Sequence, residues 1–388
     1  MAVKILSVDD EQDLEILLSQ FFRRKIRKGE YEFTFAHNGL EALQLVLEKK
    51  DFDIILSDIN MPEMDGLTLL TKINELRNPG LKCIIVSAYG DMANIRTAMN
   101  NGAFDFATKP IDLNDLSVTI EKAVEQINYI KASKQEHNQL ESLRGDLAIA
   151  GEIQQAILPR VFPPFPEFAD KIDIYASMTP AKEVGGDFYD FFKIDDNRIG
   201  FVIADVSGKG VPASLFMAVS RTLLRSTGIR GVSSSDCLDY TNRLLSGESL
   251  DSMFDTVFYG IYNLETGEID YTNAGHNPPY VLRHDNTVTM LPITKNFVVG
   301  GFEDYKYKNS TLQLEVGDTL VMFTDGVTEA FNEQGEMFGE SGLEKTLRSV
   351  PGAGSQEISD AILEDIKDFV GNEPQSDDIT TLLLKRLK

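Results

Sequence analysis

The C-terminal half of this sequence contains predicted hydrophobic strands that each have an aspartate at one end. This feature most restricts how that half can fold. Between Gly185 and Gly210, two short apolar strands are predicted, because glycine-rich and Asp/Asn-rich breaks bracket them. Asp187 stands at the start of the first strand, and Asp205 ends the second. A carboxylate at the end of a buried strand is costly unless it is paired or binds a cation. The pattern therefore predicts a metal site.

Two acidic turns further along the chain repeat this pattern. Asp325-Gly326 follows a hydrophobic strand, and Asp377-Asp378 opens the final strand. Mg²⁺ and Mn²⁺ prefer oxygen ligands and keep several waters, so a few carboxylates at strand ends are sufficient to bind them. Any one Asp-Gly pair is equally well explained as a turn, but the repetition at strand ends favours one shared site.

The motifs around these acids follow one another in a characteristic order. They are GGDFYD at 185–190, DVSGKG at 205–210, NAGHNPP at 273–279, TDGVTE at 324–329 and DDIT at 377–380. As an ordered set they resemble the bacterial PPM-family metal-dependent serine/threonine phosphatases, which act in sigma-factor partner switching and sporulation. The resemblance covers about residues 150–388.

This resemblance implies an α+β sandwich of two β-sheets flanked by helices, with the phosphatase domain expected over residues 161–388. It implies two Mg²⁺ or Mn²⁺ ions that activate a shared water. Asp205 would bridge the ions and the Val206 carbonyl would complete one shell. Asp325 and Asp377 would hold the first ion, and Asp187 would support the second, so these four aspartates are the expected catalytic residues.

Three other residues in or near these motifs could take part in metal binding or catalysis, but each has a simpler interpretation. Asp378 matches a position where many relatives have asparagine, so Asp377 is the expected ligand of the adjacent pair. Lys182 lies where related eukaryotic enzymes often have a phosphate-binding arginine, yet an exposed lysine is the simpler interpretation. His276 is interpreted as part of a structural loop rather than as an acid or base.

Residues 1–122 alternate between strand and helix patterns, which predicts a doubly wound, five-stranded parallel sheet with its site at the carboxyl ends of the strands. Polar residues follow those strands: Asp9, Asp10, Asp58, Ser87 and Lys109. Carboxylates on adjacent strand ends repel one another unless a cation such as Mg²⁺ neutralises them. One of them could then accept a phosphoryl group, which a hydroxyl and an ammonium group would contact.

With DINMPEMDG at 58–66, this arrangement resembles the receiver domain of two-component response regulators. The resemblance implies that Asp58 accepts phosphate from a cognate histidine kinase. One Mg²⁺ would be held by Asp10, Asp58 and the Asn60 carbonyl, with Asp9 supporting the metal shell. Ser87, Lys109 and Phe106 would form the switch, and Phe106 lacks the hydroxyl of the tyrosine that receivers often have. A receiver-like fold that is never phosphorylated is the alternative.

A helical linker is expected over residues 123–160, since the chain from Leu116 to Leu158 lacks proline and has two glycines. Apolar residues recur at the three- and four-residue steps of a coiled-coil seam, interrupted near His137: Leu116, Ile120, Ala123, Ile127, Ile130, Leu140, Leu143, Leu147, Ala150, Ile153 and Ile157. This favours a homodimer through the linker, with a single solvated helix as the alternative. The final turns before Pro159 resemble a helix that acts as a switch in regulated PPM enzymes.

Composition limits the partners and the compartment. The formal net charge of −24 argues against a nucleic-acid surface, so proteins are the expected partners. No signal peptide is expected at the start of the chain, and no apolar run of about 18 residues predicts a membrane span, so a cytoplasmic protein is expected. The two cysteines, Cys83 and Cys237, are interpreted as packing residues.

Together these features predict a response regulator in which phosphorylation of Asp58 controls a phosphoserine/phosphothreonine phosphatase. The resemblance points to an anti-sigma factor antagonist as the substrate. The alternative is a catalytically silent adaptor that sequesters a protein partner. The sign of the control, the kinase, the preferred metal and the oligomeric state in each phosphorylation state stay open.

Overall fold

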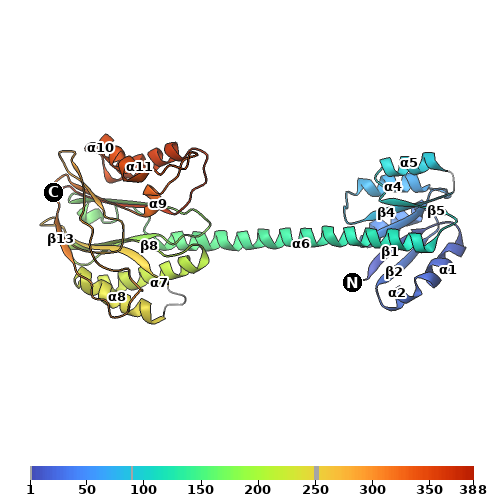
Figure 1. The fold of residues 1–388 in the computed structure, drawn as a ribbon, viewed down its shortest axis with the longest axis horizontal. Helices are drawn as coiled ribbons and strands as arrows, with labels where there is room; N and C mark the ends of the chain where they lie inside the picture. Colours follow the sequence, from blue (N-terminus) through green and yellow to red (C-terminus); the bar gives the residue numbers. More distant parts are fainter. Residues whose placement is uncertain (1, 89–90, 249–252) are drawn as a thin grey trace. The chain divides into compact units, whose positions relative to one another are not determined.

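Figure 1 shows the computed structural model of the protein, which describes residues 2–88, 91–248 and 253–388. The chain divides into two compact units, Met1–Ser142 and Leu143–Lys388. Parallel strands alternate with helices in the first unit, whereas two antiparallel sheets dominate the second. The predicted fold class, a receiver followed by a phosphatase sandwich, is confirmed.

The first unit contains a five-stranded parallel sheet in the order β2-β1-β3-β4-β5. The strands are β1 (Val3–Val8), β2 (Tyr31–Ala36), β3 (Ile54–Asp58), β4 (Lys82–Ala88) and β5 (Asp105–Lys109). The helices are α1 (Gln12–Phe21), α2 (Arg23–Arg27), α3 (Gly39–Lys49), α4 (Gly66–Glu75), α5 (Met92–Asn100) and the beginning of α6 (Leu113–Ile157). Continuous apolar runs such as Ile54-Ile55-Leu56 are buried, as expected for parallel strands covered on both faces.

Helices form an apolar layer on each face of this sheet. α3, α4 and α5 supply Val46, Leu69 and Ala98 to one layer. α1 and the beginning of α6 supply Leu18 and Leu116 to the other. The carboxyl ends of the strands are left free for polar residues.

The beginning of α6 corrects one sequence interpretation. The predicted seam residues Leu116, Ile120, Ala123 and Ile127 are buried in the core of the first unit, so they do not form a seam with another helix. A receiver core and a coiled coil require the same three- and four-residue spacing, so periodicity cannot separate them. Later residues of α6 are exposed, with Leu143 56% and Ile153 64% exposed.

The second unit stacks two five-stranded antiparallel sheets. The first has the order β13 (Ser310–Gln313), β10 (Glu268–Ala274), β9 (Asp255–Asn263), β8 (Arg198–Val206), β7 (Phe188–Lys193). The second has the order β12 (Val288–Met290), β11 (Tyr280–Leu282), β14 (Thr319–Phe323), β15 (Ile379–Arg386), β6 (Ile172–Thr179). An apolar core that includes Phe201, Phe258 and Leu382 draws on both sheets.

Helices cover the outer faces of both sheets. Figure 1 shows α7 (Val211–Gly228) and α8 (Ser234–Glu248) on one side of the sandwich, and α10 (Gly339–Ser349) and α11 (Ser355–Val370) on the other. Two short helices, η1 (Pro166–Phe168) and α9 (Asp325–Thr328), complete this unit as far as the structure describes it. β13 and α9, each four residues long, were not predicted from the sequence.

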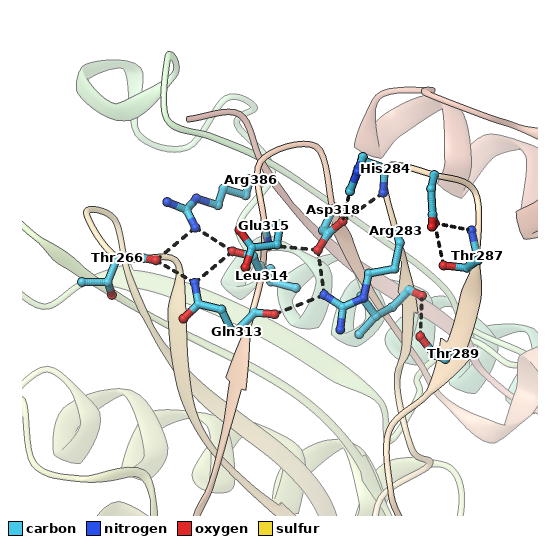
Figure 2. Close-up of polar contacts among 12 residues, drawn as sticks. Thr266, Arg283, His284, Thr287, Thr289, Gln313, Leu314, Glu315, Asp318 and Arg386 are labelled. Atoms are coloured by element: carbon cyan, nitrogen blue, oxygen red, sulfur yellow. Dashed lines mark hydrogen bonds and ion pairs between the residues drawn. The ribbon is translucent and has the colours of Figure 1, made fainter.

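A polar network joins loops at the edges of the sandwich (Figure 2). Asp318 is fully buried and accepts hydrogen bonds of 2.7 Å from Arg283 Nη1 and 2.9 Å from the main-chain nitrogen of His284. Burial alone would raise the pKa of Asp318. The hydrogen bonds that it accepts from Arg283 and from the main-chain nitrogens of Glu315 and His284 outweigh burial, so its pKa is lowered. Arg386 donates to the carbonyl of Leu314, which ties β15 to the same region.

Among the described residues, no helix is long and apolar enough to cross a lipid bilayer.

Candidate active site

The four predicted phosphatase acids lie at sheet ends that meet. β7 and β8 pair in an antiparallel register, which puts Asp187 and Asp205 at the same end of the first sheet. β14 and β15 also pair antiparallel, so Asp325 and Asp377 flank one end of the second sheet. Residues distant in sequence are thereby brought together by strand pairing.

Asp187 is buried and joins the two sheets. One of its carboxylate oxygens accepts hydrogen bonds of 2.6 Å from the hydroxyls of both Thr324 and Thr380. Burial raises the pKa of Asp187 well above its ordinary value, the charge of Asp205 raises it further, and the two hydroxyls oppose both effects. The hydroxyls therefore set the direction in which this carboxylate points.

Burial and neighbouring carboxylates raise the pKa values of both Asp205 and Asp325. Burial, together with the charges of Asp325 and Asp377, raises the pKa of Asp205 to about 7. Burial also raises the pKa of Asp325, as do the charges of Glu329 and Asp377. A bound cation relieves repulsion of this kind. The all-oxygen donor set fits hard divalent ions such as Mg²⁺ and Mn²⁺, and the roles of the individual ligands stay predictions.

Two neighbouring main-chain segments complete the site. A Cβ atom added to Gly186 would lie 3.1 Å from the carbonyl oxygen of Val206, so glycine lets the two segments approach. Asp378 accepts hydrogen bonds of 2.7 Å from the nitrogen of Gly186 and 2.8 Å from that of Ala181. The Asp378 carboxylate thus holds the main chain in place, whereas Asp377 is the more exposed of the pair.

Lys209, which was not among the predicted site residues, also contacts one of the acids. Its ammonium nitrogen lies 2.7 Å from Asp377 Oδ2 and 2.9 Å from the carbonyl oxygen of Ser376. The hydrogen bond with Asp377 raises the pKa of Lys209. Lys182 is exposed as well, but Lys209 is the lysine that pairs with an acid of the site. The structure therefore favours Lys209 over Lys182 as a cation near a phosphoryl group.

The end of α6 packs against the segment that leads into Asp187. Gln154 is buried and exchanges two hydrogen bonds with Gly185, of 2.6 Å to its carbonyl oxygen and 3.0 Å from its nitrogen. Gly151 lies close by, because an added Cβ atom would be only 2.1 Å from the carbonyl oxygen of Glu183. This contact connects the predicted switch helix to the acidic site.

His276 sits in a closed loop near the site. It is buried, and its main-chain nitrogen and oxygen both bond to the side chain of Asn273. Its Nδ1 lies 3.0 Å from the hydroxyl of Thr256, and burial lowers its pKa to about 4. A neutral, enclosed imidazole suits a structural loop better than proton transfer.

The predicted receiver residues also come together. Asp9, Asp10 and Asp58 place possible ligand atoms within 4.8 Å of one another, which no other such acidic, histidine or cysteine set does among the described residues. Burial raises the pKa of Asp58, while Lys109 opposes that effect. The Asn60 side chain is exposed just beyond the end of β3. One lysine cannot neutralise three carboxylates, so their clustered oxygens fit one Mg²⁺.

Lys109 contacts these acids, and the other predicted switch residues lie on the neighbouring strands β4 and β5. The ammonium nitrogen of Lys109 lies 2.9 Å from oxygens of both Asp9 and Asp58. Ser87 is buried at the end of β4, and Phe106 on β5 is 36% exposed. These positions place the phosphoryl-contacting residues of the prediction at neighbouring strand ends.

Comparisons with known proteins agree with the division of the chain into a receiver and a phosphatase domain. The model of the response regulator receiver domain matches residues 5–121, and that of stage II sporulation protein E (SpoIIE) matches residues 195–387. Fold and matches together define a protein serine/threonine phosphatase that carries a receiver domain.

Similarity to individual proteins identifies the family of phosphatases within this class. Phosphoserine phosphatase RsbU of Bacillus subtilis is 35% identical over 261 residues, covering 65% of this chain and 74% of RsbU. Protein IcfG of Synechocystis is 32% identical over 270 residues, covering 63% of this chain but 42% of IcfG. The SiaA-PP2C domain of Pseudomonas aeruginosa shares the fold, with a TM-score of 0.56, 23% identity, and coverage of 64% of this chain and 98% of that domain. The chain belongs to the SpoIIE/RsbU family of protein phosphatases.

Several residues at the site were not predicted from the sequence. In sequence, Gln154 looks like an ordinary polar residue of a helix. Thr324 and Thr380 look like ordinary residues at the ends of strands. Lys209 lies inside the DVSGKG motif, and its place in that motif could have indicated that it lies at the acidic site. The threonines sit directly before Asp325 and shortly after Asp378, which could have suggested a role beside the acids.

Proposed function

We propose that this protein is a response regulator that hydrolyses phosphoserine or phosphothreonine in a small protein, an anti-sigma factor antagonist, under the control of Asp58 phosphorylation by a histidine kinase. The observation that carries the phosphatase assignment is the position of Asp205, Asp325 and Asp377 at neighbouring sheet ends, where burial together with the charges of Asp325 and Asp377 raises the pKa of Asp205 to about 7. Such a cluster is unfavourable without a cation and suited to binding one.

Asp205, Asp325, Asp377 and the Val206 carbonyl would hold two Mg²⁺ or Mn²⁺ ions, and Asp187 would support the second. When bound, such ions supply a water of lowered pKa and neutralise phosphoryl oxygens. Thr324 and Thr380 hold the Asp187 carboxylate in one orientation. In the receiver, Asp9, Asp10, Asp58 and the Asn60 carbonyl would hold one Mg²⁺.

The chain's own residues would position the substrate. Lys209 is half-exposed beside Asp377, within reach of an anionic group at the acids. Asp378 fixes the main chain of Gly186 and Ala181, which keeps the glycine-rich segment close to Val206. This arrangement limits the movement needed at the moment of reaction.

Control would pass through α6, whose first turns pack in the receiver core and whose last turn contacts Gly185 through Gln154. Phosphorylation of Asp58 would redistribute the contacts of Lys109 and Ser87 and change the conformation or pairing of α6. A shift of Gln154 would then move the segment that carries Asp187. The exposed apolar residues of α6, such as Leu143 and Ile153, support a homodimer through this helix.

The substrate class rests on the relatives. RsbU carries the name phosphoserine phosphatase and covers the largest matched share of this chain among the relatives described above. Its similarity includes the segment that follows the receiver, since 65% of this chain is matched. A phosphorylated protein is therefore the proposed substrate.

The test measures hydrolysis of a phosphoserine peptide by the full chain with Mn²⁺, with and without beryllofluoride as a phosphoryl mimic. We expect turnover that beryllofluoride changes in the wild type and leaves unchanged in Asp58→Asn. Metal-dependent turnover without any beryllofluoride response would refute the control. No turnover of phosphoserine or phosphothreonine peptides would refute the activity and favour the adaptor.

A further inference from the structure

A cavity of about 350 Å³ lies beside the acidic site of the phosphatase unit. We call it the α11 pocket, because one face of α11 lines it through Leu363, Ile366, Lys367 and Val370. These residues recur at three- and four-residue steps, so they share one side of the helix. Ala330 and Phe331 extend the apolar lining.

The pocket shares main chain with the acids. Gly326, which follows Asp325, and Ser376, which precedes Asp377, both line it. A Cβ atom added to Gly326 would lie 2.0 Å from the carbonyl oxygen of Asp378, so the two acidic turns touch at this point. A polypeptide bound with its phosphoryl group at the acids therefore passes next to the pocket.

The loop between the pocket and the acids is held in place. The side-chain amide of Gln375 donates hydrogen bonds of 2.9 Å to the carbonyl oxygen of Thr179 and 2.6 Å to that of Asp377. The hydroxyl of Ser376 donates to the carbonyl of Glu329 over 3.4 Å. The pocket is thus preformed, which reduces the entropy cost of binding.

The lining is apolar although the neighbouring site is strongly charged. Leu363 and Val370 are partly exposed, and Phe331 is 37% exposed. None of them contributes to the proposed chemistry. An apolar recess with a polar rim, here Lys367 and Glu373, is the usual form of a binding pocket, and this volume lies at the small end of that class.

We propose that the α11 pocket binds one apolar side chain of the phosphoprotein substrate, close in sequence to the phosphorylated residue. This inference rests on the proposed function, because it assumes a phosphoprotein at the acids. Continuity with the acidic site selects the substrate as occupant over a second copy of this chain. The pocket would make the enzyme selective for phosphoserine segments with a flanking leucine, isoleucine, methionine or phenylalanine.

The test compares kcat/KM for phosphoserine peptides in which a single leucine is moved through the flanking positions of an otherwise polar sequence. p-Nitrophenyl phosphate, which has no flanking residues, serves as the comparison substrate. The full chain with Mn²⁺ should prefer leucine at one flanking position by about tenfold, the scale of discrimination by one apolar side chain. Val370→Trp should remove this preference and leave p-nitrophenyl phosphate turnover unchanged.

Val316→Trp is the matched control, because Val316 is an exposed valine near the opposite end of β14 from Asp325. It should keep the leucine preference. If Val370→Trp does not fold, Phe331→Ala removes part of the lining and should also weaken the preference. Wild-type turnover that is indifferent to leucine, or a preference that both pocket variants keep, would overturn the inference. A wild type inactive on every phosphoester would instead overturn the proposed function.

Discussion

The side chain of Gln154 and the main chain of Gly185 exchange two hydrogen bonds, of 2.6 and 3.0 Å. Gly185 lies two residues before Asp187, so a helix that begins in the receiver core ends on the segment that carries a proposed metal-site acid. A position of α6 that breaks these bonds would leave buried main-chain groups without partners, at a cost of about 1–3 kcal/mol. This cost disfavours any movement of the end of α6 away from Gly185.

Gln154→Ala should therefore weaken metal use by the phosphatase. We expect the Mn²⁺ concentration for half-maximal hydrolysis to rise about tenfold, which corresponds to about 1.4 kcal/mol. A Mn²⁺ titration of peptide hydrolysis measures it. Glu152→Ala, an exposed neighbour on the same helix, is the control. An unchanged Mn²⁺ dependence in Gln154→Ala would separate this contact from the active site.

Gly151→Ala should also raise the Mn²⁺ concentration needed for half-maximal hydrolysis. Here the cause would be displacement of the main chain, not loss of the Gln154–Gly185 hydrogen bonds. The added Cβ atom would lie 2.1 Å from the carbonyl oxygen of Glu183, so α6 or the segment that contains Glu183 must shift. Gly145→Ala is a matched control on the same helix, because a Cβ atom there meets nothing within 4 Å. That control should stabilise the helix by about 0.5–1 kcal/mol without impairing hydrolysis. Equal activity of both variants would argue against close packing at Gly151.

Lys209 should compete with a divalent cation for Asp377, because its ammonium group lies 2.7 Å from that carboxylate. Lys209→Gln removes the competing charge, and we expect Mn²⁺ to bind about two- to fivefold more tightly, as suits a half-exposed ion pair. Turnover should fall if Lys209 also contacts the phosphoryl group. Isothermal titration with Mn²⁺ measures the affinity, with Lys182→Gln as control. Weaker Mn²⁺ binding in Lys209→Gln would contradict the competition.

The Asp318 network should stabilise the fold in a pH-dependent way. The folded-state pKa of Asp318 lies below its ordinary value of 3.8, so the ionised form is favoured on folding. Its stabilisation is therefore fully present above about pH 4 and is lost as the pH falls through the folded-state pKa. Asp318→Asn should cost about 1–3 kcal/mol at neutral pH and less at pH 3.

Urea denaturation of both proteins at the two pH values measures this difference. Asp304→Asn, at an exposed position in the same unit, is the control and should cost little at either pH. A cost of Asp318→Asn that is the same at both pH values would show that ionisation of this carboxyl does not contribute.

The strands that end in Asp58, Asp205 or Asp325 were predictable, because each is a continuous apolar run followed by a break and a charge. Strand order was not predicted, because such runs do not encode it; the ordered motifs implied only a sandwich of two sheets through the family. The contacts between the two sheets, such as Thr324 and Thr380 on Asp187, depend on how the sheets stack, which no local pattern encodes.

The linker shows where periodicity is insufficient. Leu116 and Ile120 follow the same spacing as Leu143 and Ile153, yet the first pair is buried in the receiver core and the second is exposed. Only the tertiary environment separates the two cases. Gln154 was missed for a similar reason, since a buried glutamine on a helix looks like a surface residue in sequence.

Peptide hydrolysis at increasing Mn²⁺ by the wild type and by Asp205→Asn tests the central claim most directly, with Asp304→Asn as control. We predict wild-type hydrolysis that requires the metal and saturates with it. In Asp205→Asn it should fall by at least about 100-fold, because the metal supplies several kcal/mol of transition-state stabilisation. Equal turnover by the two proteins, or wild-type turnover that persists in a chelator, would contradict the account.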